Sequence, residues 1–339
     1  MKKLLLLLGG LLLISCSKKE INYPKVSLKN NLLEMEVYLP DAEKGYYRGP
    51  RFDWSGMIKS VKYDGHIIFK NFSDNHNPTA NDNATGPAEE FGMGTIKGLP
   101  PAFNYNNTKI GKLFGKIGVG YLTKVQSHWL NDKKPYKKPN KYRFGWNYPI
   151  KKSIPWEINH DKNKISFSQK LKLNNNWSYE YKKEIKLLSD KPGFIITHEL
   201  KNTGEKTILT SHYSHNFIAI DNEYIGTNYS LELPFNLITK RPLKGLVKIN
   251  NNILSYIQNL NDKAIFLPFN GFEKLKNTTF IIKNKKSKIG IKIFIQGKPI
   301  AINFFYNKNT ISPEAFIKLN IKPNEKVKWI IKYIFFKIK

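Results

Sequence analysis

The stretch Ser211-His-Tyr-Ser-His-Asn-Phe-Ile-Ala-Ile-Asp221 gives the first indication of the fold. It predicts a β-strand, because β-branched and aromatic residues dominate it and its polar residues occur singly rather than in a turn cluster. Side chains alternate between the two faces of a strand, so Tyr213 and His215 share one face while His212 and Ser214 share the other. Only one of the two histidines can therefore face a given cleft, and we expect it to be His215.

Segments of the same kind surround this stretch. Four precede it, at residues 156–160, 165–173, 177–188 and 194–200, with short connections rich in Asn, Gly and Pro. They predict an antiparallel meander that ends with residues 208–221. Hairpins are predicted at 26–39 and at 57–69, the second around Asp64-Gly65, and later strands at 246–257, 264–267, 279–282, 289–294, 301–305 and 327–336.

The remaining stretches complete the prediction of fold class. Residues 71–107 are rich in Asn, Pro and Gly without sustained periodicity, which indicates a long loop or a set of loops. No helical period lasts three turns beyond the N-terminal segment, and neither an internal repeat nor a linker divides the chain. These patterns predict one large all-β domain over residues 25–339, a sandwich or a barrel.

The composition argues against a nucleic-acid partner in spite of a net charge of +30. Such a charge ordinarily indicates nucleic acid or another anionic surface. Here lysine is spread along the whole chain together with Asn and Ile, and only four of the 56 basic residues are Arg. This distribution favours a compositional bias on solvated faces over a binding footprint. Hydrophobic residues make up 40% of the chain, which excludes wholesale disorder.

The N-terminus predicts a bacterial lipoprotein. Residues 1–15 combine Met-Lys-Lys with a short apolar run, too short to span a bilayer, and end in Leu-Ile-Ser directly before Cys16. That ending resembles a lipobox. A lone thiol could also be a buried apolar residue or a nucleophile, but its position after the apolar run favours lipidation. We expect residues 16–24 to form a lipidated tether that anchors the protein in the cell envelope, facing the periplasm or the exterior.

The segment from Gly45 to Met57 is a candidate sugar-binding site. It holds two of the four arginines, Arg48 and Arg51, together with Asp53, a tryptophan and two tyrosines. Flat aromatic faces stack on sugar C–H faces, while guanidinium and carboxylate groups bind hydroxyls. A purely structural Arg51–Asp53 ion pair at a strand end is the alternative.

Carboxylates in two other segments are candidates for acid–base chemistry. Glu89 and Glu90 are neighbours in the predicted loop, so in an extended chain one could face the cleft and the other solvent or a positive partner. A solvated pair is the alternative. Glu314 follows Ser-Pro at the start of an apolar strand, where partial desolvation would raise its pKa and suit it to act as a base. A surface glutamate is the simpler reading of that position.

Motifs for other chemistries are missing from the sequence. His198-Glu lacks the second histidine of the zinc-binding His-Glu-x-x-His pattern, and the Asp and Asn residues at 73–83 fit no calcium loop. No phosphate-binding glycine loop and no Gly-x-Ser-x-Gly elbow occurs. We therefore expect no metal and no cofactor.

Several motifs together resemble a bacterial lipoprotein subgroup of the galactose mutarotase-like (aldose 1-epimerase-related) superfamily. They occur in the right order over most of the chain: Tyr47-Arg-Gly-x-Arg-Phe-Asp-Trp-Ser-Gly56, Gly86-Pro-x-Glu-Glu-Phe91, Lys116-Ile-Gly-Val-Gly120, Tyr213-x-His-Asn-Phe217 and Ser312-Pro-Glu314. The resemblance implies a large antiparallel β-supersandwich with a sugar-binding cleft on one concave sheet.

The resemblance also implies an activity and residue roles. In aldose 1-epimerases a strand histidine protonates the ring oxygen of the sugar while a late glutamate takes the proton of the anomeric hydroxyl. Carried over, His215 is the acid, Glu314 the base and Arg51 a sugar ligand. Together with residues of this chain's own motifs, the candidate substrate-binding residues are Arg48, Arg51, Asp53, Glu90 and Asn216. The expected partner is a free sugar or an oligosaccharide.

The match to the aldose 1-epimerases is incomplete. They have an Asn-His pair followed by Tyr-Phe-Asn, whereas this chain has Ser214-His215 followed by Asn216-Phe217. The superfamily also includes polysaccharide-acting and purely sugar-binding members, so the fold does not fix the reaction. A non-catalytic carbohydrate-binding lipoprotein is the alternative function.

Overall fold

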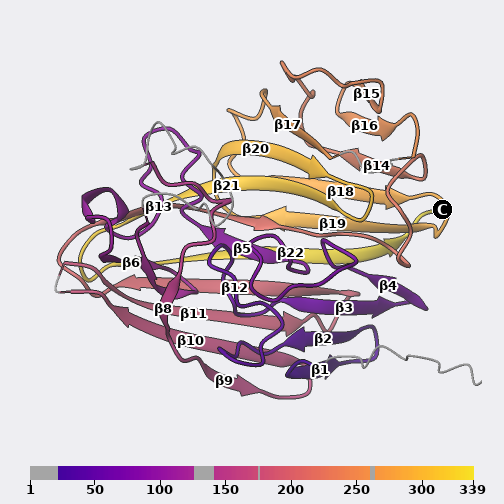
Figure 1. The fold of residues 1–339 in the computed structure, drawn as a ribbon. Helices are drawn as coiled ribbons and strands as arrows, with labels where there is room; N and C mark the ends of the chain where they lie inside the picture. Colours follow the sequence, from indigo (N-terminus) through magenta and orange to yellow (C-terminus); the bar gives the residue numbers. More distant parts are fainter. Residues whose placement is uncertain (1–21, 126–140, 175, 260–263) are drawn as a thin grey trace, which may run out of the picture.

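The strands of the computed structural model form four antiparallel sheets (Figure 1). The structure describes residues 22–125, 141–174, 176–259 and 264–339, which include one short 3₁₀ turn at Tyr105–Asn107. Within these residues, no helix is long and apolar enough to cross a bilayer. The all-β prediction is confirmed.

The largest sheet has ten strands and contains the predicted meander. Its order is β15 (Val247–Asn250), β16 (Ile253–Tyr256), β14 (Tyr229–Glu232), β18 (Thr278–Asn284), β19 (Ile289–Ile295), β22 (Lys326–Lys337), β12 (Gly193–Asn202), β11 (Ser178–Leu187), β10 (Lys164–Lys172) and β9 (Glu157–His160). Burial alternates along β11, as expected for a sheet that covers a core on one face. The buried face is mostly aromatic and aliphatic, but it includes Lys183 and His198.

A five-stranded sheet lies across this core and carries the candidate site. Its order is β17 (Ile265–Phe269), β20 (Pro299–Tyr306), β21 (Ile311–Ile321), β13 (Ile208–His215) and β5 (Ala88–Phe91). Every strand of this sheet contributes residues to the main hydrophobic core, which also includes the buried face of the ten-stranded sheet. The two sheets thus pack face to face, as in a β-sandwich.

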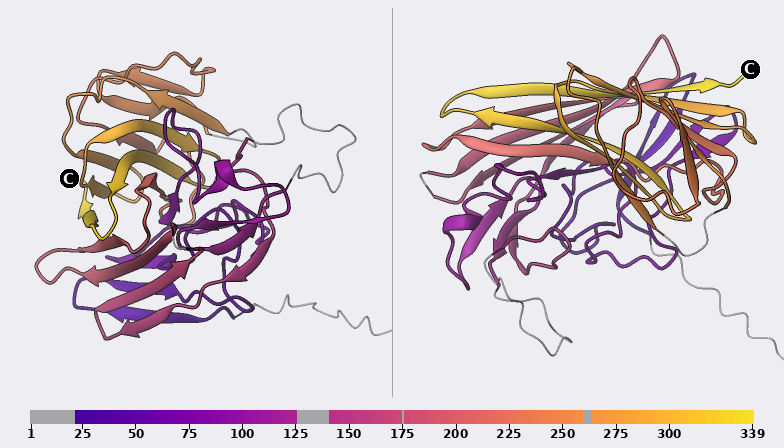
Figure 2. Two further views of the ribbon diagram at one scale, coloured as in Figure 1. Left: turned by 90° about the vertical axis from the view of Figure 1, so that its left-hand side faces the viewer. Right: turned by 90° about the horizontal axis from the view of Figure 1, so that it is seen from above.

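Two small sheets come from the N-terminal half. One joins β1 (Lys25–Lys29), β2 (Glu34–Tyr38), β3 (Ile58–Tyr63) and β4 (His66–Ile68), and the other joins β6 (Leu113–Lys116), β7 (Gly120–Thr123) and β8 (Ile150–Ser153). Seen from above, the indigo and purple N-terminal segments lie to one side of the long strands (Figure 2, right). Both predicted N-terminal hairpins are present, and Asp64 and Gly65 have φ values of 50° and 84°, as a type I′ turn requires.

Three details of the sequence prediction are wrong. The predicted strand 208–221 ends at His215, because the chain turns at Phe217, where φ is 45°. The meander ends at β12, since β13 crosses to the other sheet and the C-terminal β22 pairs with β12 instead. Glu89 and Glu90 belong to the short strand β5 rather than to a loop, because their backbone pairs with β13.

Candidate functional site

The pairing of β5 with β13 separates two groups of polar side chains. His215 pairs with Ala88 and Tyr213 with Glu90, and their side chains share one face of the five-stranded sheet. The alternate positions, which include His212 and Glu89, share the opposite face, toward the ten-stranded sheet. The sequence-based expectation that His212 and His215 point in opposite directions is confirmed.

A cavity of about 580 Å³ opens on the face that carries His215. Its volume lies within the ordinary range of small-molecule sites. The wall is largely apolar, formed by Phe72, Met93, Ile96, Phe144, Phe266, Ala301 and Phe305. The polar groups that line it are Arg51, Asp82, Thr95, His215, Asn303 and Glu314. The structure therefore brings His215, Glu314 and Arg51 to one cavity.

His215 and Glu314 face each other across the neighbouring strands β13 and β21. The pairing that aligns His212 with Ile317, continued along both strands, places His215 opposite Glu314. His215 Nε2 lies 3.4 Å from Glu314 Oε1. The His215 ring stacks on Phe217 with 4.1 Å between ring centroids, which fixes its orientation.

Burial shifts the pKa values of this pair in opposite directions. The pKa of the Glu314 carboxyl is raised to about 8 by burial, partly offset by the charge of Arg51. The pKa of His215 is held well below its ordinary value, mainly by burial and further by the charge of Arg51. At neutral pH the pair therefore holds one acidic proton, on Glu314, beside a neutral imidazole. The resemblance implied the opposite placement of this proton.

Arg51 is held by three partners from different parts of the chain. Its Nε donates to Glu90 Oε2 at 2.9 Å, its Nη2 donates to the Tyr213 hydroxyl at 2.8 Å, and its Nη1 pairs with Asp82 Oδ1. The guanidinium also packs against the ring of Phe144, 4.6 Å from its centroid. The planar guanidinium of arginine offers several donors in fixed directions, and the ammonium group of lysine cannot bind all these partners in the same way.

Glu90 supports Arg51 from behind the cavity. It is fully buried, and its second oxygen accepts a hydrogen bond from Lys116 Nζ at 3.0 Å. Burial raises the pKa of Glu90, but the charges of Lys116 and Arg51 outweigh burial and hold that pKa below its ordinary value. Asp82, Arg51, Glu90 and Lys116 thus form an alternating chain of charges, in which each buried ion has an opposite neighbour.

Four of the five predicted substrate-binding residues do not line this cavity. Asp53 is buried with Lys183, 3.1 Å from its Nζ, and accepts a hydrogen bond from Tyr181. Asn216 donates to the Pro313 carbonyl at 2.5 Å and accepts from the Tyr333 hydroxyl at 2.7 Å, which ties the end of β13 to β21 and β22. The backbone N–H of Arg48 donates to the Pro78 carbonyl. Glu90 reaches the cavity only through Arg51.

Three residues of the site were not among the predicted site residues. Tyr213 shares the strand face of His215, and Lys116 begins a motif already noted, so both could have been found by strand alternation or by local motif. Asp82 lies in a stretch without periodicity, and only the folded chain brings it to Arg51. Cys16, the predicted lipidation site, lies outside the described residues.

Comparison with known proteins bears on the fold. No family model and no curated protein matches the sequence. Among similar solved structures, the Slr1438 protein from Synechocystis sp. PCC 6803 is 11% identical with a TM-score of 0.54, and the alignment covers 93% of this chain and 96% of that chain. A galactose mutarotase-like protein from Clostridium acetobutylicum is 12% identical with a TM-score of 0.52, covering 93% and 95% of the two chains.

A galactose mutarotase related enzyme from Lactobacillus acidophilus is also similar. It is 10% identical with a TM-score of 0.50, and the alignment covers 93% of this chain and 99% of that chain. Identities this low show a common fold and leave the activity to be argued from the site. The chain has the galactose mutarotase-like fold, in agreement with the resemblance found in its sequence.

Proposed function

We propose that the cavity binds the reducing end of a sugar and that His215 and Glu314 interconvert its anomers. The observation that carries this proposal is the pairing of one buried acid with one buried neutral base, 3.4 Å apart, at a cavity of about 580 Å³. General acid–base catalysis needs groups in complementary protonation states within reach of the same substrate.

The chemistry needs one proton donor and one proton acceptor. One group protonates the ring oxygen while the other removes the proton of the anomeric hydroxyl, so that the C1–O5 bond breaks and an open-chain aldehyde forms. After rotation about the C1–C2 bond, the reverse transfers close the ring and restore both groups. The pair holds a single proton, and its pKa directions favour Glu314 as the first donor and His215 as the first acceptor.

The cavity wall supports a sugar as the substrate. Phe72, Phe144 and Phe305 offer aromatic surface for the C–H faces of a pyranose. Arg51, Asp82 and Asn303 offer donors and acceptors for hydroxyl groups. Because Asp82 and Glu90 already neutralise Arg51, we expect a neutral sugar rather than a sugar acid.

The test measures the rate at which pure α-anomers of hexoses and reducing disaccharides equilibrate, followed by polarimetry or NMR. We expect the wild-type chain to accelerate equilibration for at least one sugar, and His215→Asn and Glu314→Gln each to lower kcat at least ~100-fold while the protein stays folded. His160→Asn, which changes an exposed histidine, is the matched control. Equal rates in wild type and both variants would refute the proposal.

A purely carbohydrate-binding function is the second candidate. The four phenylalanines of the cavity wall favour it, because stacking on sugar faces requires no proton transfer. A glycan array followed by calorimetry distinguishes the two functions. Binding that depends on the cavity residues, without acceleration of mutarotation for any bound sugar, would establish binding alone.

We also propose that the protein is anchored in the bacterial cell envelope through Cys16. The apolar run that ends directly before the only cysteine supports this. In cells fed a labelled fatty acid, we expect label on the wild-type chain and none on Cys16→Ser, which should leave the membrane fraction. Label that persists in the variant would contradict the anchor.

A further inference from the structure

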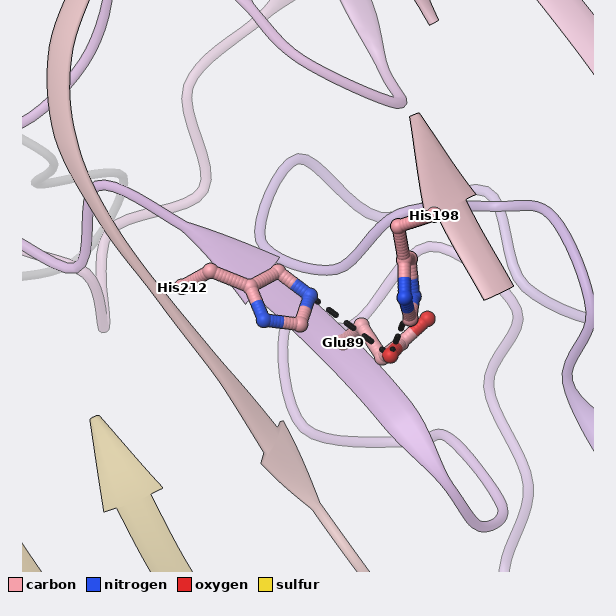
Figure 3. A group of neighbouring side chains, drawn as sticks. All are labelled: Glu89, His198 and His212. Atoms are coloured by element: carbon pink, nitrogen blue, oxygen red, sulfur yellow. Dashed lines mark ion pairs between the residues drawn. The ribbon is translucent and has the colours of Figure 1, made fainter. Parts of the chain in front are cut away.

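Behind the cavity, three metal-ligating side chains meet between the two large sheets. Glu89 comes from β5, His212 from β13 and His198 from β12, and all three point toward one another (Figure 3). Glu89 Oε1 lies 2.7 Å from His198 Nε2 and 3.5 Å from His212 Nε2, and one ligand atom from each residue lies within 4.8 Å of the others. Each residue is at most 1% exposed.

The contacts within this cluster lack the geometry of hydrogen bonds. Neither His198 Nε2 nor His212 Nε2 has a hydrogen-bond partner among the described residues, although both lie close to Glu89 Oε1. Buried polar atoms without partners are rare, and a common reason is an ion or water at the site. Ligands around an ion aim their lone pairs at the ion and not at one another, which produces close contacts without alignment.

The spacing of the ligand atoms agrees with a small divalent ion. With metal–ligand bonds of about 2.0–2.1 Å, the ligand atoms of a tetrahedral zinc site lie about 3.3 Å apart. The two observed distances, 2.7 and 3.5 Å, lie on either side of that value. Two histidines and one glutamate are a ligand set that proteins use for zinc.

The surroundings of the cluster orient these ligands. Lys183 Nζ pairs with Glu89 Oε2 and donates to the Ser55 carbonyl at 2.7 Å, which leaves Glu89 Oε1 turned toward the histidines. Ser214 Oγ donates to that oxygen at 3.3 Å. The His198 ring stacks on Trp329 at 4.7 Å between centroids. Such outer contacts fix ligand orientation in metal sites.

A proton explains the cluster less completely than a metal ion does. A proton on His198 would give one ion pair with Glu89, but it would leave His212 Nε2, 3.5 Å from the same oxygen, without a partner. A cation between the three residues serves all three ligand atoms. We propose that Glu89, His198 and His212 bind a zinc ion, with a water molecule in the fourth position, and that this ion ties β5 and β13 to the ten-stranded sheet.

The site is fully buried, so the ion would enter as the chain folds. The test uses the full chain, purified without a polyhistidine tag and dialysed against metal-free buffer, with zinc measured by mass spectrometry. We expect about one zinc per chain. Refolding in the presence of a chelator should lower the Tm by several degrees, and refolding with zinc, but not with magnesium, should restore it.

Variants locate the ion. We expect His198→Gln and His212→Gln to lose at least ~90% of the zinc, because each removes one of three ligands. His160→Gln is the matched control, since it changes an exposed histidine on β9, outside the cluster, and should keep the zinc. Wild-type protein that folds without zinc and has a Tm unaffected by zinc or chelator would overturn the proposal. So would zinc content unchanged in both histidine variants. If the variants do not fold, wild-type zinc content and its chelator dependence decide the question.

Discussion

At the scale of single residues, strand alternation divides the polar chemistry of this protein into two compartments. On β5, Glu90 supports Arg51 at the cavity while Glu89 turns into the core. On β13, His215 faces Glu314 while His212 faces Glu89. Adjacent or nearly adjacent residues therefore serve different sites, and their substitutions should have separable effects.

The raised pKa of Glu314 leads to a prediction on stability. Burial raises this pKa to about 8, so the folded protein binds a proton that the unfolded chain releases near pH 4.5. Stability from this group is therefore highest below pH 4.5 and decreases as the pH rises toward 8. Glu314→Gln, which is neutral at every pH, should be more stable than wild type at pH 9 by on the order of 4 kcal/mol, and nearly equal at pH 5. Urea unfolding at both pH values measures the difference.

Glu157→Gln is the control for that experiment, because Glu157 is exposed on β9 and its substitution should change stability little at either pH. A Glu314→Gln difference that does not grow between pH 5 and pH 9 would contradict the raised pKa.

The same pair predicts the pH dependence of the proposed activity. Catalysis needs the form of the pair that carries one proton. This proton is lost when Glu314 ionises above a pH of about 8. A second proton is added only when His215 is protonated, and its pKa lies well below the ordinary value for histidine. We expect kcat/KM to stay level through neutral pH and to fall above about pH 8, measured for the best sugar found. A loss of activity as the pH is lowered through about 6.5 would mean that His215 is protonated like a solvated histidine, and it would contradict the buried pair.

At the scale of elements, two glycines with positive φ allow the cost of backbone strain to be compared with the cost of a steric clash. Gly65 in the β3–β4 turn has φ of 84° and open space at its Cβ position, whereas Gly92, directly after β5, has φ of 62° and lies against the Pro101 carbonyl. We expect Gly65→Ala to lower the free energy of unfolding by about 1 kcal/mol from backbone strain alone. Gly92→Ala should cost several-fold more, because it adds a backbone clash. Equal losses in urea unfolding would show that the Gly92 contact relaxes.

Strands with regular alternation could be predicted from the sequence, and those with other patterns could not. Residues 164–172 and 178–187 alternate buried and exposed positions, and both were predicted nearly to their ends. The strand β5 has four consecutive buried residues, two of them charged, so it shows neither alternation nor an apolar run. Its identity as a strand depends on β13 and on partners such as Lys116 that lie elsewhere in the sequence.

The same distinction applies to the candidate site. His215 and Glu314 were predicted through motifs, and Arg51 through the scarcity of arginine in the chain. The Glu89–His198–His212 cluster has no local spacing that would reveal it, because its three residues come from three strands of two sheets. Local patterns identify ligands on one element, and only tertiary structure identifies ligands shared among several.

At the scale of the whole molecule, the chain has a net charge of +30, and the outer face of the ten-stranded sheet carries glutamates interspersed among its lysines. Glu199 pairs with both Lys326 and Lys328, Glu184 with Lys164, and Glu180 with Lys170. Interspersed acidic groups weaken the local potential that a polyanion would meet, even where lysine is in excess. The absence of a nucleic-acid partner stays a prediction.

That expectation is tested with duplex DNA over a range of salt concentrations. The excess of lysine should give weak binding in low salt, through release of counterions from the DNA, and the affinity should fall steeply as salt rises. By about 0.15 M salt we expect only the weak affinity typical of non-specific binding, with Kd no tighter than about 10⁻⁶ M, measured by fluorescence anisotropy. Sequence-independent binding of the same strength to heparin would agree with a simple charge effect. Nanomolar binding to DNA at that salt would contradict the expectation, because it would require a dedicated basic surface. Such a surface would have to lie elsewhere than the face of the ten-stranded sheet on which lysines pair with glutamates.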